Sequence, residues 1–551
     1  MEDKGPFDRI LQPEPRGERD RSAVIVVAAT IVLGLLLLLL ILPPISILDD
    51  GGDGPATSLG PVVTRLRDDL PAPPDGFEAV SGLFDLETQE PVDRPARLTV
   101  DLSSRVGAGE QLLLFTYQDD AWRQIGSAVP VAGGDAAQGE VSTLPANIAV
   151  FRGVEQSRTV TGRLQRGGQP DGAALDTIAT LYIRGFEPAA DGSIAGGAFE
   201  APEGVDGDLA ATISATSAEG IENVNAVLSS ADLRAAHVQD IAGFAAANGL
   251  TAIEIDYEQI DRARSDAFVS FVEELASVLG DGGRSLTLTL PAPVRTPDGF
   301  DTLGFDWEAL APLVSTITLA SISEQDLYHE RTEDALGYLV PRIGAGKLVL
   351  TVTPLSRERG VDGVRTLTLT EALGLASVPS IDPEGPVASG TDVQASGQNL
   401  GDPVAGGGLT WDDTARAVVF NYTGPGGLRT VWLANAFSEA FKLDLARRYQ
   451  LGGVAVDDIS SGAADAGIWP AVEQYARSGA VDLVKPNGDL LTPRWEASAG
   501  ELASDAGVSV TWTAPEETGT YTLTLIVSDG MVRVGRELPV VVETATGARA
   551  R

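Results

Sequence analysis

Apolar runs alternate with helix-like stretches over residues 157–480. Strands that alternate with helices predict a parallel sheet, because parallel neighbours need a crossover connection. Eight candidate strands are present, in the order "RTVTGRL", "TIATLYI", "LAATISA", "AIEIDY", "SLTLTL", "TITLAS", "KLVLTVT" and "GGVAVD". Eight such units predict an α/β fold with a (β/α)8 barrel over residues 157–480.

One stretch interrupts this alternation between the seventh and eighth candidate strands. Residues 380–408 are rich in Gly, Ser and Pro, and the following "LTWDDTARAVVFNYTGPGGLRTVWLAN" has the alternation of a β-hairpin. We therefore expect an insertion over residues 380–434. It would lie on or near the rim of the barrel, where it could line a groove.

The segment before the barrel also has a β pattern. Short alternating runs such as "ARLTVDLSS" and "EQLLLFTYQ" are separated by turn residues. Residues 77–153 are therefore predicted to form a small all-β domain, whose default role is that of a spacer or recognition module.

The last segment predicts a second β module. Its alternating runs and its "APEETG" and "SDGM" turns indicate an immunoglobulin-like β-sandwich over residues 485–544. The stretch "TAPEETGTYTLTLIVSDG" resembles bacterial extracellular Ig-like and polycystic-kidney-disease-type modules. The simplest role for such a module is that of a spacer or stabiliser.

Near the N-terminus, residues 23–42 are twenty uncharged, mostly apolar residues. This length predicts one transmembrane helix. Basic residues precede the run and none follows it before Arg65, which predicts a single-pass cell-membrane protein with a cytoplasmic tail over residues 1–22 and an extracytoplasmic bulk. Residues 43–76 are rich in Gly, Pro and Asp and are predicted to form a linker. The alternative is a cleaved signal peptide, although the apolar run is longer than a usual signal core.

Composition excludes several kinds of chemistry. The 78 acidic and 39 basic residues give a formal charge of −39, which repels phosphate backbones and makes nucleic acid an unsuitable partner. The chain has no cysteine and two histidines, so disulfides, thiolate nucleophiles and Cys-ligated zinc are excluded, and a histidine triad or multi-histidine metal site nearly so. Carboxylates are therefore the main candidates for acid/base chemistry, and no metal is expected.

Carboxylates concentrate in "LTAIEIDYEQID", the fourth candidate strand and the residues around it. Because successive side chains of a strand point to opposite faces, Glu254, Asp256 and Glu258 share one face, while Tyr257 lies on the other. Inside a barrel, repulsion and desolvation would raise the pKa of at least one of these carboxylates. An exposed acidic edge strand fits the alternation equally well, and the pattern alone leaves both interpretations open.

The stretch "NGLTAIEIDYEQI" resembles the signature of family-18 glycoside hydrolases, the chitinase-like (β/α)8 enzymes whose fourth strand carries D-x-x-D-x-D-x-E. Together with "SADLRAAHVQDIAGFAAANGL" and "KLDLARRYQLGGVAV", it is similar to the spore-cortex and cell-surface hydrolases of this family. The resemblance covers residues 157–478.

The resemblance implies a role for each carboxylate of the motif. Glu258 stands at the position of the proton donor, Asp256 at that of the residue that orients the substrate's N-acetyl group, and Glu254 at that of an aspartate that shares a proton with Asp256. The family uses substrate-assisted retaining hydrolysis, in which the acetamide oxygen attacks the anomeric carbon. It implies an N-acetylhexosamine polymer such as chitin or peptidoglycan as substrate, and no cofactor.

The chain departs from the family pattern at three places. Thr251 replaces the first aspartate of the motif, Ser321 stands in the segment where the family has Met-x-Tyr-Asp, and Asp457 replaces a tryptophan that stacks on the sugar. Tyr328 or Glu324 is a candidate substitute for the missing tyrosine. The predicted substrate-binding residues are Tyr257, Tyr182, Tyr328 and Asp457. With Asp458, Asp457 could alternatively bind a cation, but a strand-end turn is the simpler interpretation.

The leading prediction is a membrane-anchored extracytoplasmic hydrolase of N-acetylhexosamine polymers, which contacts the bilayer through one helix. The departures motivate an alternative, a catalytically inactive barrel that binds cell-envelope glycan or a surface partner. A third, weaker prediction is a purely structural surface protein.

Overall fold

The computed structural model describes residues 58–59, 62–67, 69–74, 77–88, 96–107, 110, 112–118, 121–141, 144–153, 158–205, 207–401 and 407–544. The predicted cytoplasmic tail and transmembrane helix lie outside these residues. Within them, no helix is both long enough and apolar enough to cross a membrane. The chain divides into two compact units, residues 1–154 and 155–551, which are described separately.

The described part of the first unit is a nine-stranded β-sheet. Alternate residues of the central strands pack on opposite faces: Leu112 and Leu114 belong to one apolar cluster, and Leu113 and Phe115 to another. The strands are β1 (Ser58–Leu59), β2 (Val62–Leu66), β3 (Phe77–Ala79), β4 (Phe84–Thr88), β5 (Ala96–Asp101), β6 (Leu112–Gln118), β7 (Ala121–Pro130), β8 (Ala136–Val141) and β9 (Asn147–Gly153).

The sheet of the first unit begins earlier than the sequence pattern indicates. Strand β2 falls in the expected linker over residues 43–76, yet it pairs antiparallel with β4 over five residue pairs. The run "VVTRL" begins with three β-branched residues, which favour a strand. The surrounding Gly and Pro residues obscure this short run in the sequence.

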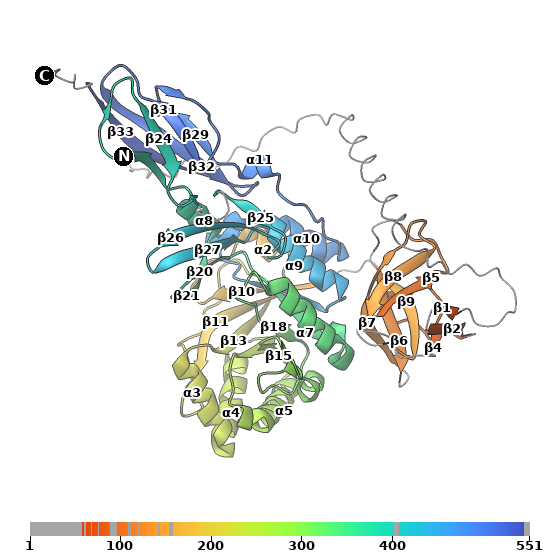
Figure 1. Ribbon diagram of the computed structural model, residues 1–551. Helices are drawn as coiled ribbons and strands as arrows, with labels where there is room; N and C mark the ends of the chain where they lie inside the picture. Colours follow the sequence, from red (N-terminus) through yellow and green to blue (C-terminus); the bar gives the residue numbers. More distant parts are fainter. Residues whose placement is uncertain are drawn as a thin grey trace. The chain divides into compact units, whose positions relative to one another are not determined.

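In the second unit, eight parallel strands close into a barrel, because β10 pairs with both β11 and β28 (Figure 1). They are β10 (Thr159–Gln165), β11 (Thr180–Pro188), β13 (Asp208–Ala215), β14 (Ala252–Tyr257), β15 (Ser285–Leu290), β18 (Ile317–Leu319), β19 (Leu348–Val352) and β28 (Gly453–Asp457). Each of the eight predicted strands is present, and the prediction of a (β/α)8 barrel is confirmed. The carboxylate strand β14 is the fourth in chain order.

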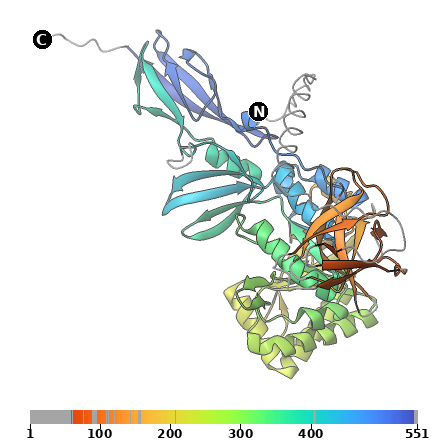
Figure 2. The ribbon, with the colours of Figure 1, turned by 45° about the vertical axis from the view of Figure 1, so that its right-hand side comes forward.

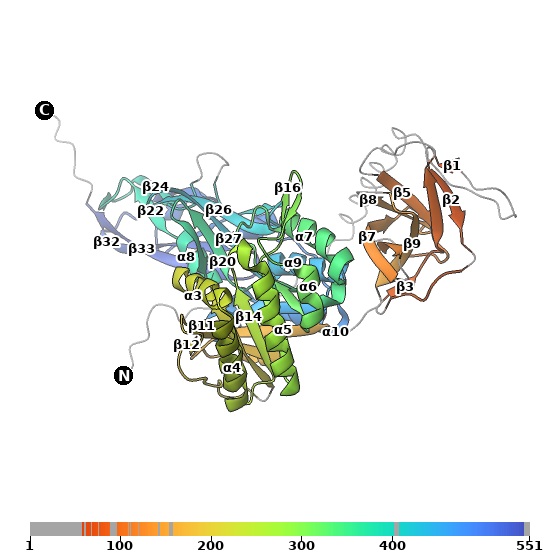
Figure 3. The same ribbon diagram turned by 90° about the horizontal axis from the view of Figure 1, so that it is seen from below.

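Helices pack on the outside of the barrel strands, as Figure 3 shows for α4 and α5 beside β14. The Ser230 hydroxyl accepts a hydrogen bond from the Leu233 amide and so caps α4. In α5, Phe268, Phe271 and Leu275 form a buried apolar stripe at helical spacing. The helices are α2 (Gly172–Leu175), α3 (Ala218–Ser229), α4 (Ala231–Ala247), α5 (Ser265–Asp281), α6 (Trp307–Leu310), α7 (Tyr328–Ile343), α8 (Leu369–Ala376), α9 (Ala436–Arg448), α10 (Trp469–Ser478) and α11 (Gly488–Leu491).

Short elements complete the loops of the barrel. They are the strands β12 (Ile194–Ala195), β16 (Val294–Thr296) and β17 (Gly299–Asp301), and the 3-10 helices η1 (Arg262–Arg264), η2 (Ala311–Leu313), η3 (Ala345–Lys347) and η4 (Ser461–Ala466). Strand β12 pairs antiparallel with the end of β11, and β16 pairs with β17.

After the seventh barrel strand, the chain forms a five-stranded antiparallel sheet, visible beside the barrel in Figure 2. Its strands are β20 (Ser356–Gly360), β21 (Gly363–Leu367), β25 (Thr410–Asp412), β26 (Ala417–Gly424) and β27 (Gly427–Leu433). The predicted β-hairpin is present as β26 and β27, which pair from Val418 and Leu433 to Gly424 and Gly427. Two of the strands, β20 and β21, precede the expected insertion over residues 380–434.

The first part of the expected insertion joins a different module (Figures 1 and 2). Two four-stranded sheets combine residues 379–397 with residues 494–543, and alternate residues such as Trp495 and Trp512 are buried. The strands are β22 (Pro379–Asp382), β23 (Val387–Ala388), β24 (Asp392–Gly397), β29 (Arg494–Ala497), β30 (Glu501–Leu502), β31 (Ser509–Thr513), β32 (Gly519–Ser528) and β33 (Arg533–Glu543). The module expected over residues 485–544 is therefore completed by strands from within the barrel segment, and its immunoglobulin-like identity stays a prediction.

Candidate active site

Strand β14 lies inside the closed sheet, between β13 and β15. The alternative of an exposed acidic edge strand is therefore wrong. The side chain of Glu254 is buried against barrel strands, while the Tyr257 hydroxyl meets His237 of α4 on the helix side. The two faces predicted from the alternation are thus confirmed for Glu254, Asp256 and Tyr257. Glu258 follows the carboxyl end of β14, at the mouth of the barrel.

Glu254 is held by a buried ion pair with Arg163 of β10. Arg163 Nε lies 2.9 Å from Glu254 Oε2, and the hydroxyls of Thr212 and Thr289 donate to the same carboxylate at 2.8 Å each. Burial alone would raise the pKa of Glu254, but the charge and hydrogen bonds of Arg163 outweigh it and lower the pKa to about 2. Among the described residues, the partners of this carboxylate are Arg163, Thr212 and Thr289, and the expectation that Glu254 shares a proton with Asp256 stays a prediction.

Asp256 has the opposite electrostatic environment. Its side chain is 13% exposed, and the nearest cation, Nη2 of Arg184, lies 4.0 Å from Oδ2. Burial raises the pKa of Asp256 to about 7, with a further contribution from the negative charge of Glu254. Asp256 therefore titrates near neutral pH, where a carboxyl group can donate or accept a proton.

Glu258 lies one residue beyond β14 and is exposed. Within the described residues, no hydrogen bond or ion pair holds its side chain. Its place just past the carboxyl end of a barrel strand is where enzymes of this fold carry catalytic groups. The carboxylate is thus accessible to a ligand at the mouth.

Arg184 of β11 joins two carboxylates at this mouth. Its guanidinium forms an ion pair with Asp457 at the end of β28 and also faces Asp256. The structure therefore brings the predicted residue Asp457 together with Asp256. The prediction missed Arg163 and Arg184. Each is an isolated cation within an apolar strand, "TVTGRLQ" or "TLYIRGF", and that isolation was the signal that could have found them.

The three predicted tyrosines do not gather at the mouth. The Tyr257 ring lies 5.9 Å from the Phe271 ring on the helix side of β14. Tyr182 lies deeper in the barrel, two residues before Arg184 on the same strand face, and burial raises its pKa to about 12. The Tyr328 hydroxyl donates to the Thr351 carbonyl at 3.2 Å. Their prediction as substrate-binding residues therefore has no support from these positions.

The residues at the family's other motif positions are also placed. Thr251 precedes β14, and its hydroxyl donates to the Leu209 carbonyl at 3.2 Å, at the end of the strand away from Asp256. Ser321 follows β18, and its buried hydroxyl has no hydrogen-bond partner among the described residues. Glu324 pairs with Arg331 at 3.1 Å.

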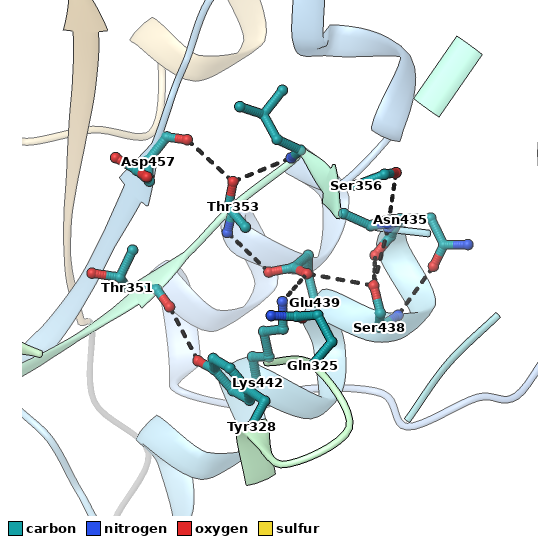
Figure 4. A network of polar contacts seen from close by, with 12 residues as sticks. Gln325, Tyr328, Thr351, Thr353, Ser356, Asn435, Ser438, Glu439, Lys442 and Asp457 are labelled. Atoms are coloured by element: carbon teal, nitrogen blue, oxygen red, sulfur yellow. Dashed lines mark hydrogen bonds and ion pairs between the residues drawn. The ribbon is translucent and has the colours of Figure 1, made fainter. Parts of the chain in front are cut away.

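A buried polar network fixes the strand ends beside Asp457 (Figure 4). The Glu439 carboxylate of α9 accepts hydrogen bonds from the Thr353 amide at 3.0 Å and from Lys442 Nζ at 2.8 Å. The Thr353 hydroxyl donates to the Asp457 carbonyl at 3.3 Å. Because every charged member has a partner, the network holds β19 and β28 against α9 at low cost.

Asp458, next to Asp457, forms a turn. Its φ is 91° and its Oδ1 accepts a hydrogen bond from the Ser460 amide at 2.8 Å. This geometry agrees with the strand-end turn preferred from the sequence. Across the described residues, no group of three or more His, Cys, Asp and Glu side chains is placed to hold a metal ion.

Comparison with known proteins gives structural likeness only. No protein-family model and no curated protein sequence matches the chain. A chitinase from Chromobacterium violaceum ATCC 12472 is 20% identical with a TM-score of 0.44, over 58% of this chain and 98% of that one. The spore cortex-lytic enzyme SleL of Bacillus megaterium QM B1551 is 16% identical with a TM-score of 0.45, over 60% and 78%. A class V chitinase from Pseudomonas fluorescens Pf-5 is 16% identical with a TM-score of 0.43, over 58% and 99%. Likeness at this level assigns no activity to the chain.

Proposed function

We propose that this chain is a family-18-type glycoside hydrolase that cleaves N-acetylhexosamine polymers by substrate-assisted retaining hydrolysis. One observation carries the proposal: Glu258 is exposed at the mouth of a closed barrel, two residues after the inward-facing Asp256, whose pKa is raised to about 7 by burial. The resemblance of the sequence around these two residues to the family signature supports it.

The arrangement defines what each carboxyl group would do. Glu258 donates a proton to the glycosidic oxygen as the bond to the leaving sugar breaks. The acetamide oxygen of the substrate attacks the anomeric carbon, and Asp256 accepts a hydrogen bond from the acetamide N–H, which orients that oxygen. Water then attacks the anomeric carbon and opens the cyclic intermediate, while Glu258, now ionised, accepts a proton from that water. Glu254 contributes a fixed charge that raises the pKa of Asp256.

The test is hydrolysis by the full chain and its Glu258→Gln variant. Release of reducing ends from chitin oligomers and peptidoglycan glycan fragments should fall by at least about 100-fold in the variant. Glu273→Gln is the matched control, because Glu273 is exposed on α5, on the outside of the barrel. The hydrolase proposal fails if the wild-type chain releases no product from either substrate.

A second candidate function is a catalytically inactive barrel that binds glycan or a surface partner. It is favoured by two contacts: Asp457, at the position of the sugar-stacking tryptophan of the family, is paired with Arg184, and the hydroxyl of Tyr328, a candidate substitute for the family tyrosine, is bound to the Thr351 carbonyl. In that case the chain would bind chitin oligomers or peptidoglycan fragments without turnover, and Glu258→Gln would leave the affinity unchanged.

We further propose that the protein is anchored in the cell membrane through residues 23–42, with the barrel outside the cytoplasm. The apolar length of this run and the basic residues before it support the proposal. Deletion of residues 1–42 should move the protein from the membrane fraction to the soluble fraction. Resistance of the barrel to protease added to intact cells, with cleavage only after lysis, would contradict the orientation.

A further inference from the structure

Arg357 of β20 is a cation without a bonded partner. Its side chain is half-buried, its Nε is buried without a hydrogen bond, and the described residues form no ion pair with it. Burial lowers its pKa. A desolvated guanidinium gains from a bound anion more than an exposed one does, because less hydration opposes the contact.

Its position places this cation at the barrel mouth. Arg357 follows the end of β19 by five residues, on the side of the barrel where β14 and β28 carry Asp256 and Asp457. The charges that act on Arg357 are those of Asp457 and Glu439. Both of these carboxylates are already bonded to other cations, Asp457 to Arg184 and Glu439 to Lys442.

The ion pairs of this region therefore leave Arg357 without a carboxylate partner. Deep in the barrel, Arg163 is matched by Glu254. Arg184 and Lys442, which bond the two carboxylates near Arg357, are also paired, whereas the described residues form no ion pair with Arg357. A half-buried arginine without an ion pair is unexpected in a chain with a formal charge of −39.

A second unpartnered donor lies beside Arg357. Trp432 of β27 is its cross-strand partner, and the two side chains share one face of the sheet. The Trp432 side chain is 4% exposed, and its Nε1 has no hydrogen-bond partner in the described part of the chain. Buried donors without partners are rare and costly, and a ligand that accepts hydrogen bonds would satisfy both.

We propose that Arg357 and Trp432 form a subsite for a carboxylate-bearing sugar, so that the preferred ligand is an anionic N-acetylated glycan instead of neutral chitin. The guanidinium binds the carboxylate through two parallel N–H···O bonds, and the indole N–H donates to the same group or to a neighbouring hydroxyl. The inference rests on the proposed function only in that the barrel mouth binds glycan, which both candidate functions share.

The test compares three tetrasaccharides bound to the full chain carrying Glu258→Gln, which prevents turnover during the measurement. One is chitotetraose, one alternates N-acetylglucosamine with N-acetylmuramic acid, and one is that second glycan with its carboxylates reduced to alcohols. Calorimetry should give at least about tenfold tighter binding of the carboxylated glycan than of either neutral one. Adding Arg357→Gln should remove this preference and leave chitotetraose binding within about twofold.

Arg234→Gln is the control, because Arg234 of α4 lies on the outside of the barrel and is paired with Glu274 of α5 at 3.2 Å. It should keep the preference. The inference is overturned if the carboxylated and reduced glycans bind equally, or if none of the three glycans binds. Either result is decisive before Arg357 is substituted. If the wild-type chain hydrolyses glycan but shows no preference for the carboxylated one, the inference about the subsite is overturned while the hydrolase proposal stands. If the chain prefers the carboxylated glycan but hydrolyses none, the inference about the subsite is supported while the hydrolase proposal fails.

Discussion

Arg163 and Glu254 form a buried ion pair across the interior of the barrel, with Arg163 Nε 2.9 Å from Glu254 Oε2. The pair fixes the charge of Glu254, which in turn raises the pKa of Asp256, the next inward-facing residue of β14. A contact between two strands thus contributes, together with burial, to the raised pKa of a residue at the mouth.

Glu254→Gln should destabilise the protein by about 3–5 kcal/mol, because it leaves the Arg163 guanidinium buried without its counter-charge. The measurement is the free energy of unfolding in urea. The double variant Arg163→Met/Glu254→Leu is the control, and it should recover most of the loss because it removes both charges. A single variant within about 1 kcal/mol of wild type would contradict this account.

Asp256→Asn should make the unfolding free energy less sensitive to pH. The pKa of Asp256 in the folded state, about 7, lies above its ordinary value of 3.8. The stabilisation that comes from its neutral form is complete below about pH 4 and is lost as the pH rises through 7. As the pH rises from 4 to 8, the unfolding free energy of the variant should therefore increase relative to that of wild type by roughly 2–4 kcal/mol.

The control for this pH series is Asp298→Asn, which removes an exposed carboxylate between β16 and β17. Parallel pH curves for wild type and Asp256→Asn would show that folding does not change the pKa of Asp256, against the prediction.

Tyr328→Phe should change turnover by less than about threefold if the hydrolase proposal holds, because the lost hydroxyl contacts the Thr351 carbonyl and not the mouth. The loss of this buried hydrogen bond should lower the unfolding free energy by about 1 kcal/mol. A fall of 100-fold or more in kcat at unchanged stability would instead mean that Tyr328 supports the reaction, as the family tyrosine does.

Asn435→Ala should destabilise the second unit by roughly 2–4 kcal/mol. Asn435 caps α9 through the Phe437 and Ser438 amides, and its Nδ2 donates to Asp529 Oδ2 at 2.7 Å in the turn between β32 and β33. The variant removes the cap of α9, and the buried carboxylate of Asp529 loses its hydrogen bond from Asn435.

Asn487→Ala is the matched control for Asn435→Ala, because Asn487 caps the short exposed helix α11. It should cost less than about 1 kcal/mol. Equal losses in urea unfolding would show that the contact between α9 and the terminal sheets adds nothing to the cap.

Local patterns in the sequence were sufficient for the barrel and for the direction of its carboxylates. Each of the eight strands is a short apolar run between helix-like stretches, and the period of two along β14 separates Glu254 and Asp256 from Tyr257. The β-hairpin of residues 417–433 is equally local. These features depend on neighbours along the chain, so the sequence pattern carries them directly.

Long-range contacts decided the charge states at the site and the composition of the terminal sheets, because such contacts join residues that no local sequence pattern relates. Glu254 meets Arg163 across 91 positions, and Asn435 meets Asp529 across 94. The ionised state of Glu254, the raised pKa of Asp256 and the completion of the terminal sheets by residues 379–397 all follow from such contacts. The sequence determined which residues face the barrel interior, and the tertiary structure determined their partners and therefore their charge, because burial and ion pairing arise only when distant strands meet.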